Sequence, residues 1–271
     1  MELKSPRSIL CVPGHKADLA AKCRNYGADQ ILWDLEDSVP SGMKEKAREV
    51  VDQHLSEGDA IRINPPGSQF YDRDMEFVNM WPGLVWIPKC QDASPLLAVL
   101  DRRRSLGAPN EVPQVALLES PGAVVALSNF RAYSYAWAGG LAFGKHDFLA
   151  AAGLSPWQSA AVDHAAAQVA LAAMARGVPC WMAPSYELDP VLVLDDAEHA
   201  LDLGFSGMGC IRPAQVEIVN HVFRPCDEDV ARAGLLIAAA EARPDEAVFR
   251  TPDGDLVSPP TLARARKVLN G

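Results

Sequence analysis

The sequence predicts a (β/α)8 barrel of the TIM type, followed by a C-terminal helical arm. Three observations support this prediction: eight short apolar runs recur between residues 8 and 211, helix-like segments separate them, and the runs are mostly continuous rather than alternating. Continuous apolar strands suit a parallel sheet that is covered on both faces. Eight strands alternating with helices over roughly 220 residues favour a closed barrel.

The predicted strands are short runs rich in β-branched and apolar residues, each followed by a turn or a helical segment. An open doubly wound sheet is the alternative, and a Gly-rich dinucleotide-binding turn after the first strand would favour it. The segment VPGHK that follows the first strand is no such turn. In chain order the predicted strands are Ser8–Val12, Gln30–Leu35, Ala60–Asn64, Leu84–Lys89, Gln114–Glu119, Tyr135–Gly140 with its continuation to Gly144, Cys180–Ala183 and Gly207–Ile211.

The segments between the strands have the composition and the end signals of helices. Glycines that are typical of a C-terminal cap follow four of them directly, at residues 27, 107, 177 and 204. Pro95 takes the favoured first helical position of the segment that ends before Gly107. The predicted helices are Lys16–Tyr26, Lys44–Leu55, Ser94–Leu106, Ser159–Arg176 and Asp195–Leu203.

A change of composition near residue 225 divides the chain. Residues 1–225 contain all eight predicted strands and form the expected barrel. Residues 226–271 form the expected arm, which either caps its own barrel or reaches a neighbouring subunit. The arm contains a predicted helix over Glu228–Glu241, a polar segment with Pro and Gly over Arg243–Pro260, and a short helix over Thr261–Leu269.

The composition excludes several classes of protein. The 271 residues include 25 Lys and Arg against 35 Asp and Glu, a formal net charge of −10. This charge repels phosphate backbones, so we expect no nucleic-acid partner. No apolar run approaches the ~20 residues of a membrane span, and residues 1–7 lack the apolar stretch of a signal peptide. The six cysteines include no C-x-x-C pair, which favours free thiols in a reducing cytoplasm.

Charged residues directly follow most of the predicted strands, where the chemistry of a barrel enzyme lies. Glu119 and Asp147 end the neighbouring fifth and sixth strands, so their carboxylates could converge on one Mg²⁺ ion, which prefers oxygen ligands. The alternative is that each carboxylate caps the following helix or pairs with a basic side chain.

Three acids and two cations gather at the ends of strands two to four. In a strand, Asp34 and Glu36 point to one side and Asp37 to the other, and such close acids repel unless they are paired. We therefore expect these acids to form ion pairs with Arg62 or Lys89 as much as to take part in catalysis themselves. The Arg62 guanidinium matches a carboxylate or an enolate oxygen, with a structural ion pair to Glu36 or Asp37 as the alternative. The nearby acids favour a protonated Lys89 over a Schiff base.

Seven short motifs occur in order along the chain. They are Arg7–Gly14, Asp34–Val39, Arg62–Asn64, Ile87–Lys89, Leu118–Ser120, Gly144 with Asp147, and Gly209–Gln215. Together they make the chain resemble the citrate lyase β-subunit-like branch of the aldolase/citrate lyase superfamily. The match runs from residue 7 to about residue 225, and more weakly to the C-terminus.

The resemblance implies a chemistry and a metal. Members are barrels that bind Mg²⁺ through residues matching Glu119 and Asp147, with Gly144 at the substrate and an arginine matching Arg62 on the oxo-acid or enolate. They make or cleave carbon–carbon bonds of small 2-oxo or 2-hydroxy acids through a metal-stabilised enolate. Their substrates are commonly coenzyme A thioesters of the citryl, malyl or citramalyl type.

The resemblance also implies partners. Two cations that contact the coenzyme A phosphates in the family fall near Lys16 and Lys22. Members are typically homotrimers or hexamers, in which the C-terminal arm covers a neighbour's site.

The chain departs from the family pattern at several places. The family's Gly-Ala-Glu-Asp is GKHD here, so His146 replaces an acid, and the family's Ile-His-Pro has Arg212 in place of the histidine. An acid near the C-terminus is replaced by Ser258, whose hydroxyl cannot act as a proton donor or base near neutral pH. The candidate bases are then Asp37 or a metal-bound water. These departures keep a second hypothesis open, a non-lytic accessory or binding subunit that retains the metal and oxo-acid site.

Overall fold

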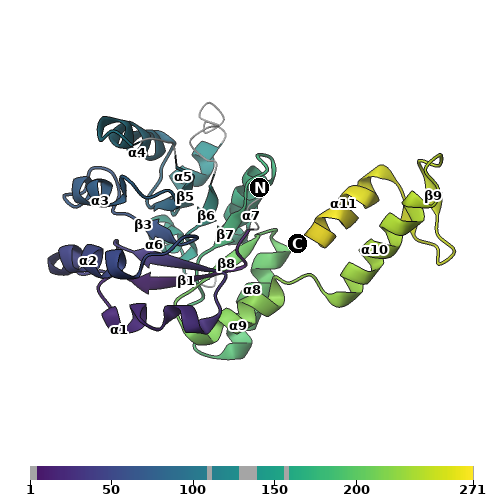
Figure 1. Ribbon diagram of the computed structural model, residues 1–271, viewed down its shortest axis with the longest axis horizontal. Coiled ribbons are helices and arrows are strands. Elements are labelled where there is room, and N and C mark those ends of the chain that lie inside the picture. The colour runs from purple at the N-terminus through teal and green to yellow at the C-terminus, as the bar shows by residue number, and fades with distance from the viewer. Residues whose placement is uncertain (1–4, 109–111, 128–138, 156–158, 271) are drawn as a thin grey trace. The chain divides into compact units, whose positions relative to one another are not determined.

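The protein, seen here in a computed structural model, contains a closed barrel of eight parallel strands within residues 5–223 (Figure 1). The structure describes residues 5–108, 112–127, 139–155 and 159–270. The strands pair in chain order, and β8 closes the barrel against β1. The predicted (β/α)8 barrel is confirmed, and the doubly wound alternative is wrong. The strands are β1 Ser8–Pro13, β2 Gln30–Asp34, β3 Ala60–Arg62, β4 Leu84–Ile87, β5 Gln114–Leu118, β6 Gly140–Phe143, β7 Cys180–Met182 and β8 Gly207–Cys210.

The sixth strand differs most from its prediction. Residues 135–138 of the predicted run Tyr135–Gly140 lie outside the described residues. The strand itself, β6, coincides with the predicted continuation toward Gly144. It pairs with β5 through Leu141 opposite Ala116, and with β7 through Leu141 opposite Cys180. The residues that precede Asp147 are therefore a strand of the barrel, as the prediction of a site at this strand end requires.

Helices follow the strands and cover the outside of the barrel (Figure 1). The predicted helix Lys16–Tyr26 is two short pieces, and the predicted helix Asp195–Leu203 starts earlier, at Pro190, because the Asp189 carboxylate caps it by accepting from the Val191 N–H. Four of the α-helices given in the next sentence, α3, α5, α6 and α9, were not expected from the sequence. The helices of this unit are α1 Ala17–Ala20, η1 Cys23–Tyr26, η2 Ser41–Met43, α2 Lys44–His54, α3 Tyr71–Val78, α4 Ser94–Ser105, α5 Pro121–Val125, α6 Lys145–Ala152, α7 Ser159–Met174, α8 Pro190–Asp202 and α9 Pro213–Val222.

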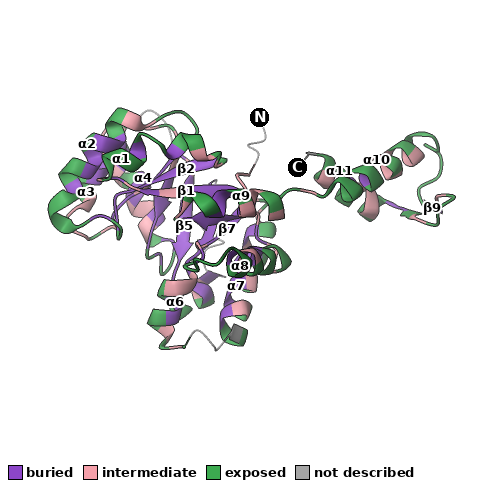
Figure 2. Cartoon of the chain, turned by 90° about the horizontal axis from the view of Figure 1, so that it is seen from below, coloured by how far each residue is buried: buried purple, intermediate pink, exposed green. Residues whose placement is uncertain are grey.

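The barrel has two apolar layers, because successive strand residues point alternately inward and outward. The outward side chains pack with the helices in one large cluster. A smaller cluster lies among residues of the strands and includes Trp86 and Trp181, whose ring centroids are 5.5 Å apart. Figure 2 shows the labelled barrel strands β1, β2, β5 and β7 as mostly buried. Apolar side chains therefore fill the barrel between its strands, and polar chemistry is confined to its end.

Residues 224–270 form a second compact unit of their own. It contains α10 Asp227–Glu241, β9 Phe249–Arg250, β10 Leu256–Val257 and α11 Pro259–Asn270. The antiparallel hairpin of β9 and β10 was not predicted. Ser258 is buried just before α11, where its N–H donates to Thr261 Oγ1 at 2.9 Å. The serine that replaces the family's acid thus lies at the start of this helix, and the role of the arm over a neighbour stays a prediction.

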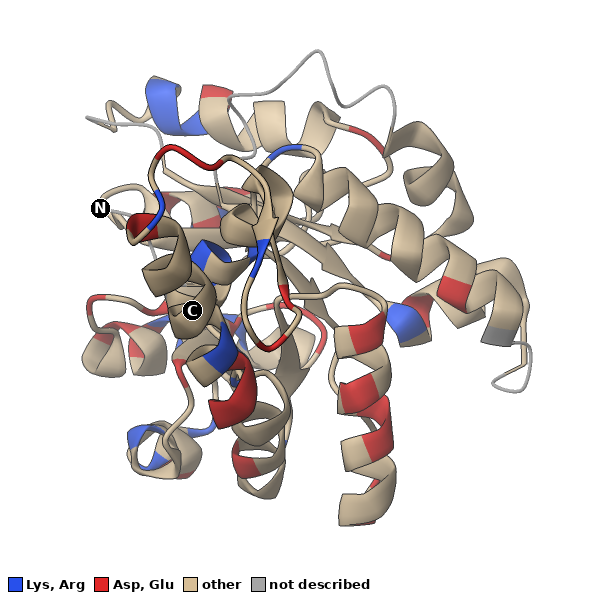
Figure 3. Ribbon diagram, turned by 90° about the vertical axis from the view of Figure 1, so that its right-hand side faces the viewer, with Lys and Arg blue, Asp and Glu red and all other residues tan. Residues whose placement is uncertain are grey.

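Several expectations from composition can be compared with the structure. None of the helices in the described ranges combines the length and apolar composition that a membrane span requires. All six cysteines are free. On the face drawn in Figure 3, basic residues are interspersed with acidic ones on the helices and loops. The expectation that nucleic acid is not a partner stays a prediction.

A buried ion pair links α2 to α3 and gives the first prediction. The Asp74 carboxylate accepts from Arg48 and, at 2.7 Å, from the Asn64 N–H, and it is fully buried. We expect Asp74→Asn to lower the free energy of unfolding by about 3 kcal/mol, because it removes the buried partner of the Arg48 guanidinium and leaves only the exposed Glu45 carboxylate. Urea denaturation followed by circular dichroism measures this loss.

The matched control is Asp72→Asn on the same helix. The Asp72 carboxylate is 73% exposed and pairs with Arg102 at the surface, so its loss should cost less than about 1 kcal/mol. Equal losses for the two variants would contradict the importance of the buried pair.

Candidate active site

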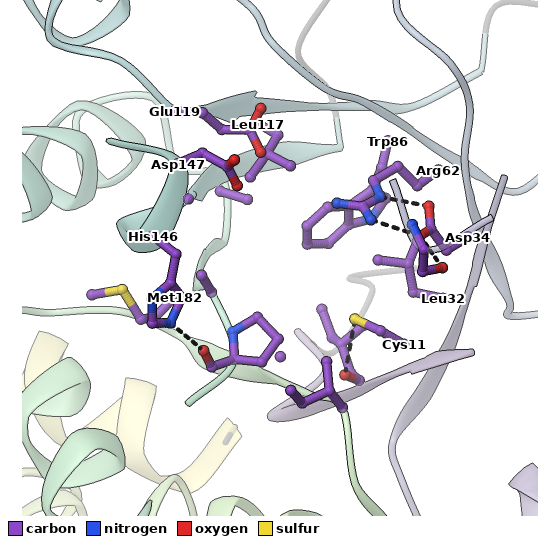
Figure 4. Close-up of a pocket in the computed structure, with 18 of the residues that line it drawn as sticks. Cys11, Leu32, Asp34, Arg62, Trp86, Leu117, Glu119, His146, Asp147 and Met182 are labelled. Carbon is purple, nitrogen blue, oxygen red and sulfur yellow. Dashed lines mark hydrogen bonds and ion pairs between the residues drawn. The ribbon is translucent and has the colours of Figure 1, made fainter. Parts of the chain in front are cut away.

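A pocket of about 180 Å³ opens at the carboxyl ends of the barrel strands (Figure 4). Residues within or directly after all eight strands line it. Its Lys, Arg, Asp and Glu residues among those described are Asp34, Arg62, Glu119 and Asp147. The structure thus gathers the four charged residues at the end of the barrel where chemistry belongs. Gly144 lines the same pocket.

Glu119 and Asp147 lie side by side on one wall of the pocket (Figure 4). Glu119 directly follows β5 and is buried, whereas Asp147 lies in the first turn of α6 and is exposed. Among the described residues, neither carboxylate forms an ion pair with Lys or Arg. Burial, together with the charges of Asp147 and Glu36, raises the pKa of Glu119 to about 8. Two unneutralised carboxylates at one wall repel each other unless a cation or a proton joins them.

The absence of a side chain at Gly144 leaves the space that the Glu119 side chain occupies. A Cβ atom on Gly144 would lie 2.5 Å from Glu119 Cγ, so any other residue would displace the carboxylate. The Gly144 N–H donates to the Leu118 carbonyl at 2.9 Å and joins the end of β5 to the start of α6. Glycine at 144 is thus required by the packing of the site.

Lys89 supports Glu119 through an unusual backbone conformation. Its φ is +56°, in the left-handed region that residues other than glycine seldom adopt. In this conformation the Lys89 N–H donates to Glu119 Oε2 at 2.9 Å. A backbone strained in this way persists only where the surrounding structure holds it in place.

Arg62 is held rigidly at the opposite side of the pocket from Asp147 (Figure 4). Its Nε and Nη2 donate to the two oxygens of Asp34, both at 2.7 Å, and its Nη1 lies 3.5 Å from Glu36 Oε2. Burial alone would raise the pKa of Asp34, but the charge and hydrogen bonds of Arg62 lower it to about 2. The expected ion pair is confirmed, with Asp34 as the main partner.

Lys89 neutralises the other two acids. Its Nζ lies 2.7 Å from Glu36 Oε1 and 3.1 Å from Asp37 Oδ1. Burial lowers the pKa of Lys89, but these pairs outweigh burial and raise it above its usual value. A protonated amine cannot form a Schiff base, so this result agrees with the preference against that chemistry. Asp37 is 54% exposed and is not among the residues that line the pocket.

Three pocket residues, Cys11, Trp86 and Tyr186, were not singled out from the sequence, and His146 was noted as the replacement of a family acid. His146 and Tyr186 stack with ring centroids 3.5 Å apart and planes 5° apart, and His146 Nε2 donates to the Pro184 carbonyl at 3.2 Å. Burial lowers the pKa of His146. Cys11 and Trp86 also line the pocket. Their inward position follows from strand alternation, and Tyr186 lies just beyond the predicted seventh strand.

The two predicted coenzyme A-binding cations lie apart from this lining. Lys16 directly precedes α1, and Lys22 directly precedes η1. Both are exposed, and neither lines the pocket. Their role stays a prediction.

Comparison with known proteins identifies the family of this barrel. The model of the HpcH/HpaI aldolase/citrate lyase family matches residues 7–213. The chain belongs to this family. The motif resemblance to the citrate lyase β-like branch is confirmed, because a citrate lyase subunit beta-like protein from Deinococcus radiodurans is 32% identical over 97% of this chain and 96% of its own length.

Two further relatives indicate the range of the family. A (3S)-malyl-CoA thioesterase from Cereibacter sphaeroides is 29% identical over 97% of this chain and 93% of its own. The crystal structure of protein CitE from Mycobacterium tuberculosis in complex with magnesium, acetoacetate and coenzyme A has a TM-score of 0.79 to this chain. That match has 25% sequence identity and covers 99% of this chain and 98% of the other.

The left-handed backbone at Lys89 gives the second prediction. Lys89→Asn and Lys89→Val both remove the ammonium from Glu36 and Asp37, so the loss of ion pairs is the same. Asn tolerates the left-handed region, whereas a β-branched residue does not. We expect the Val variant to be less stable than the Asn variant by about 1 to 2 kcal/mol in urea denaturation. Equal stabilities would show that this backbone conformation carries no constraint.

Proposed function

We propose that this protein is a Mg²⁺-dependent carbon–carbon lyase that acts on a small 2-oxo or 2-hydroxy acid, free or as a coenzyme A thioester. The observation that carries the proposal is the pair of carboxylates, Glu119 and Asp147, on one wall of the pocket without a paired Lys or Arg among the described residues. The family, and the magnesium and coenzyme A in the complex of CitE, support it.

The residues of the pocket fit a magnesium ion. Mg²⁺ is typically bound through one or two carboxylates, with substrate and water as its other ligands. In the described ranges no group of three or more His, Cys, Asp and Glu residues is arranged to hold a metal. A site of two carboxylates therefore suits Mg²⁺ better than a metal that requires several protein ligands. When bound, Mg²⁺ acts as a Lewis acid that stabilises negative charge on the oxygens of the substrate.

Arg62 supplies the second positive charge. The bidentate pair with Asp34 uses Nε and Nη2 and fixes the plane of the guanidinium, whereas Nη1 lies 3.5 Å from Glu36 Oε2 and takes no part in that pair. Such a preorganised donor stabilises a developing enolate without reorganising during the reaction. Asp34 is thus a positioning residue for Arg62.

The proposed cleavage breaks the bond between the hydroxyl-bearing carbon and its neighbour. The hydroxyl loses its proton and becomes the oxo group, while the bonding electron pair leaves as an enolate, which Arg62 stabilises and which then takes up a proton. Asp37, whose carboxylate is held by Lys89, and a metal-bound water stay the two predicted candidates for the proton acceptor. Lys16 and Lys22 stay the predicted contacts for coenzyme A, and a homotrimer or hexamer stays the predicted assembly.

Removal of either carboxylate tests the proposal. We expect Glu119→Gln and Asp147→Asn each to lower Mg²⁺-dependent turnover of citryl-, malyl- or citramalyl-type thioesters, or of the free acids, by on the order of 10²-fold. Chromatography of the products separates cleavage, which releases a 2-oxo acid, from hydrolysis, which releases the intact hydroxy acid.

The exposed Asp101→Asn on α4 is the matched control and should keep full activity. Full activity in both site variants would refute the site, and hydrolysis alone would refute the lyase. Binding of Mg²⁺ and a 2-oxo acid with no turnover of any substrate would favour the accessory subunit.

Magnesium affinity should rise with pH up to about 8. The pKa of Glu119 lies above the ordinary value of 4.5, so the metal-free site holds a proton that Mg²⁺ must displace. Below this pKa the affinity should fall about tenfold per pH unit for one displaced proton. Calorimetric titration with Mg²⁺ at pH 6.5 and 8.5 measures the change, and Glu119→Gln should flatten it. An affinity that is unchanged or lower at pH 8.5 would contradict this assignment.

A further inference from the structure

Two residues that depart from the family pattern join α6 to its neighbours. His146, where the family has an acid, stacks on Tyr186 of the loop between β7 and α8, with ring centroids 3.5 Å apart. Lys145, where the family has alanine, places its Nζ 3.4 Å from Asp196 Oδ1 on α8. Both residues lie in the first turn of α6. The start of this helix is therefore linked to the β7–α8 loop and to α8 at the same time.

Asp196 also holds the β7–α8 loop. Its Oδ2 accepts from the Ser185 hydroxyl at 2.6 Å, and Ser185 is buried. The Ser185 Oγ accepts in turn from the Glu187 N–H at 3.2 Å. The two oxygens of Asp196 thus serve different elements, Oδ1 the start of α6 and Oδ2 the loop. One carboxylate connects the two elements that carry the stacked rings.

Two residues after β8 hold the same loop from another side. Gln215 Nε2 donates to the Ser185 carbonyl at 2.9 Å. Arg212, a third departure from the family pattern, donates from Nη1 to the carbonyls of Tyr186 and Glu187 at 3.5 and 3.4 Å. These bonds fix the loop toward α9, whereas Asp196 fixes it toward α6.

The stacked rings form part of the pocket wall. His146, Pro184 and Tyr186 all line the pocket, and in Figure 4 His146 lies near Asp147, across the pocket from Arg62. The stack and the bond from His146 to the Pro184 carbonyl restrict both rings. A rigid wall beside the metal-binding carboxylates can fix the orientation of a bound ligand, which favours its reaction.

We propose that Asp196 is a positioning residue that keeps Tyr186 stacked on His146. It does so by holding Lys145 and Ser185 at once, and it is not itself among the residues that line the pocket. The stacked rings then form a fixed wall that orients a Mg²⁺-bound 2-oxo acid. The inference rests on the proposed function, because the wall has a ligand to orient only if the metal and the acid bind in this pocket.

Proton NMR of the full chain tests the positioning. Protons above the face of an aromatic ring are shielded, so stacking on Tyr186 should shift the ring protons of His146 upfield. Spectra at pH 8.5 compare neutral imidazoles, because burial lowers the pKa of His146 below its ordinary value of 6.5. We expect Asp196→Ala to remove most of the upfield shift and Tyr186→Leu to remove all of it. The signal is assigned by its loss in His146→Gln.

The matched control is Asp195→Ala, which removes the exposed neighbouring carboxylate on the same helix and should keep the upfield shift. An unchanged His146 signal in Asp196→Ala would overturn the inference. If Asp196→Ala does not fold, Ser185→Ala and Lys145→Met each remove one of the two links. Each should then reduce the upfield shift, and an unchanged signal in both would overturn the inference equally.

Calorimetric titration separates this inference from the proposed function. Mg²⁺ alone should bind the native chain and Asp196→Ala equally, because its two carboxylates are retained. With saturating Mg²⁺, pyruvate should bind Asp196→Ala about tenfold more weakly, because two loosened side chains must be ordered on binding. If pyruvate and Mg²⁺ do not bind the native chain, the proposed function fails and the wall has no ligand to orient. If both bind and Asp196→Ala keeps the native affinity for pyruvate, the inference alone is wrong.

Discussion

Closure of the barrel between β1 and β8 is the constraint on which the site depends. The pairing of Leu10 with Cys210 brings the first and last strands together and places the ends of all eight strands around one rim. Gly207 makes this contact possible, because a side chain there would collide with the Arg7 carbonyl. Asp34 and Arg62 are 28 residues apart, and they meet because β2 and β3 are neighbours in this closed sheet.

Several acidic residues lie at the rim of the barrel. Those that form ion pairs with Arg or Lys have a structural role, and those without such a pair are the candidates for chemistry. Asp34 is satisfied by Arg62, and Glu36 and Asp37 are satisfied by Lys89. Glu119 and Asp147 have no such partner among the residues that the structure describes. Glu119 is buried, and a buried carboxylate without a cation is unfavourable, so a cation bound between Glu119 and the exposed Asp147 would stabilise this pair.

The sequence allowed the barrel and its charged rim to be predicted, since strand ends are local features. Continuous apolar runs marked the strands, and the acids that follow them marked Glu119 and Asp147. The hairpin of β9 and β10 was missed because two-residue strands are too short to show a period. The left-handed Lys89 and the stacking of His146 on Tyr186 depend on contacts between different strand ends, so no local pattern shows them.

The departure of the chain from its family at position 146 is consistent with the charge balance of the pocket. The family motif has an acid next to the residue that matches Asp147, and an acid here would add a fourth negative charge to the lining. Arg62 and one Mg²⁺ together can balance three acids but not four. His146 stacks on Tyr186 and donates to the Pro184 carbonyl, so the residue that replaces the acid forms part of an uncharged wall. The replacement thus keeps the number of Asp and Glu residues in the described lining at three.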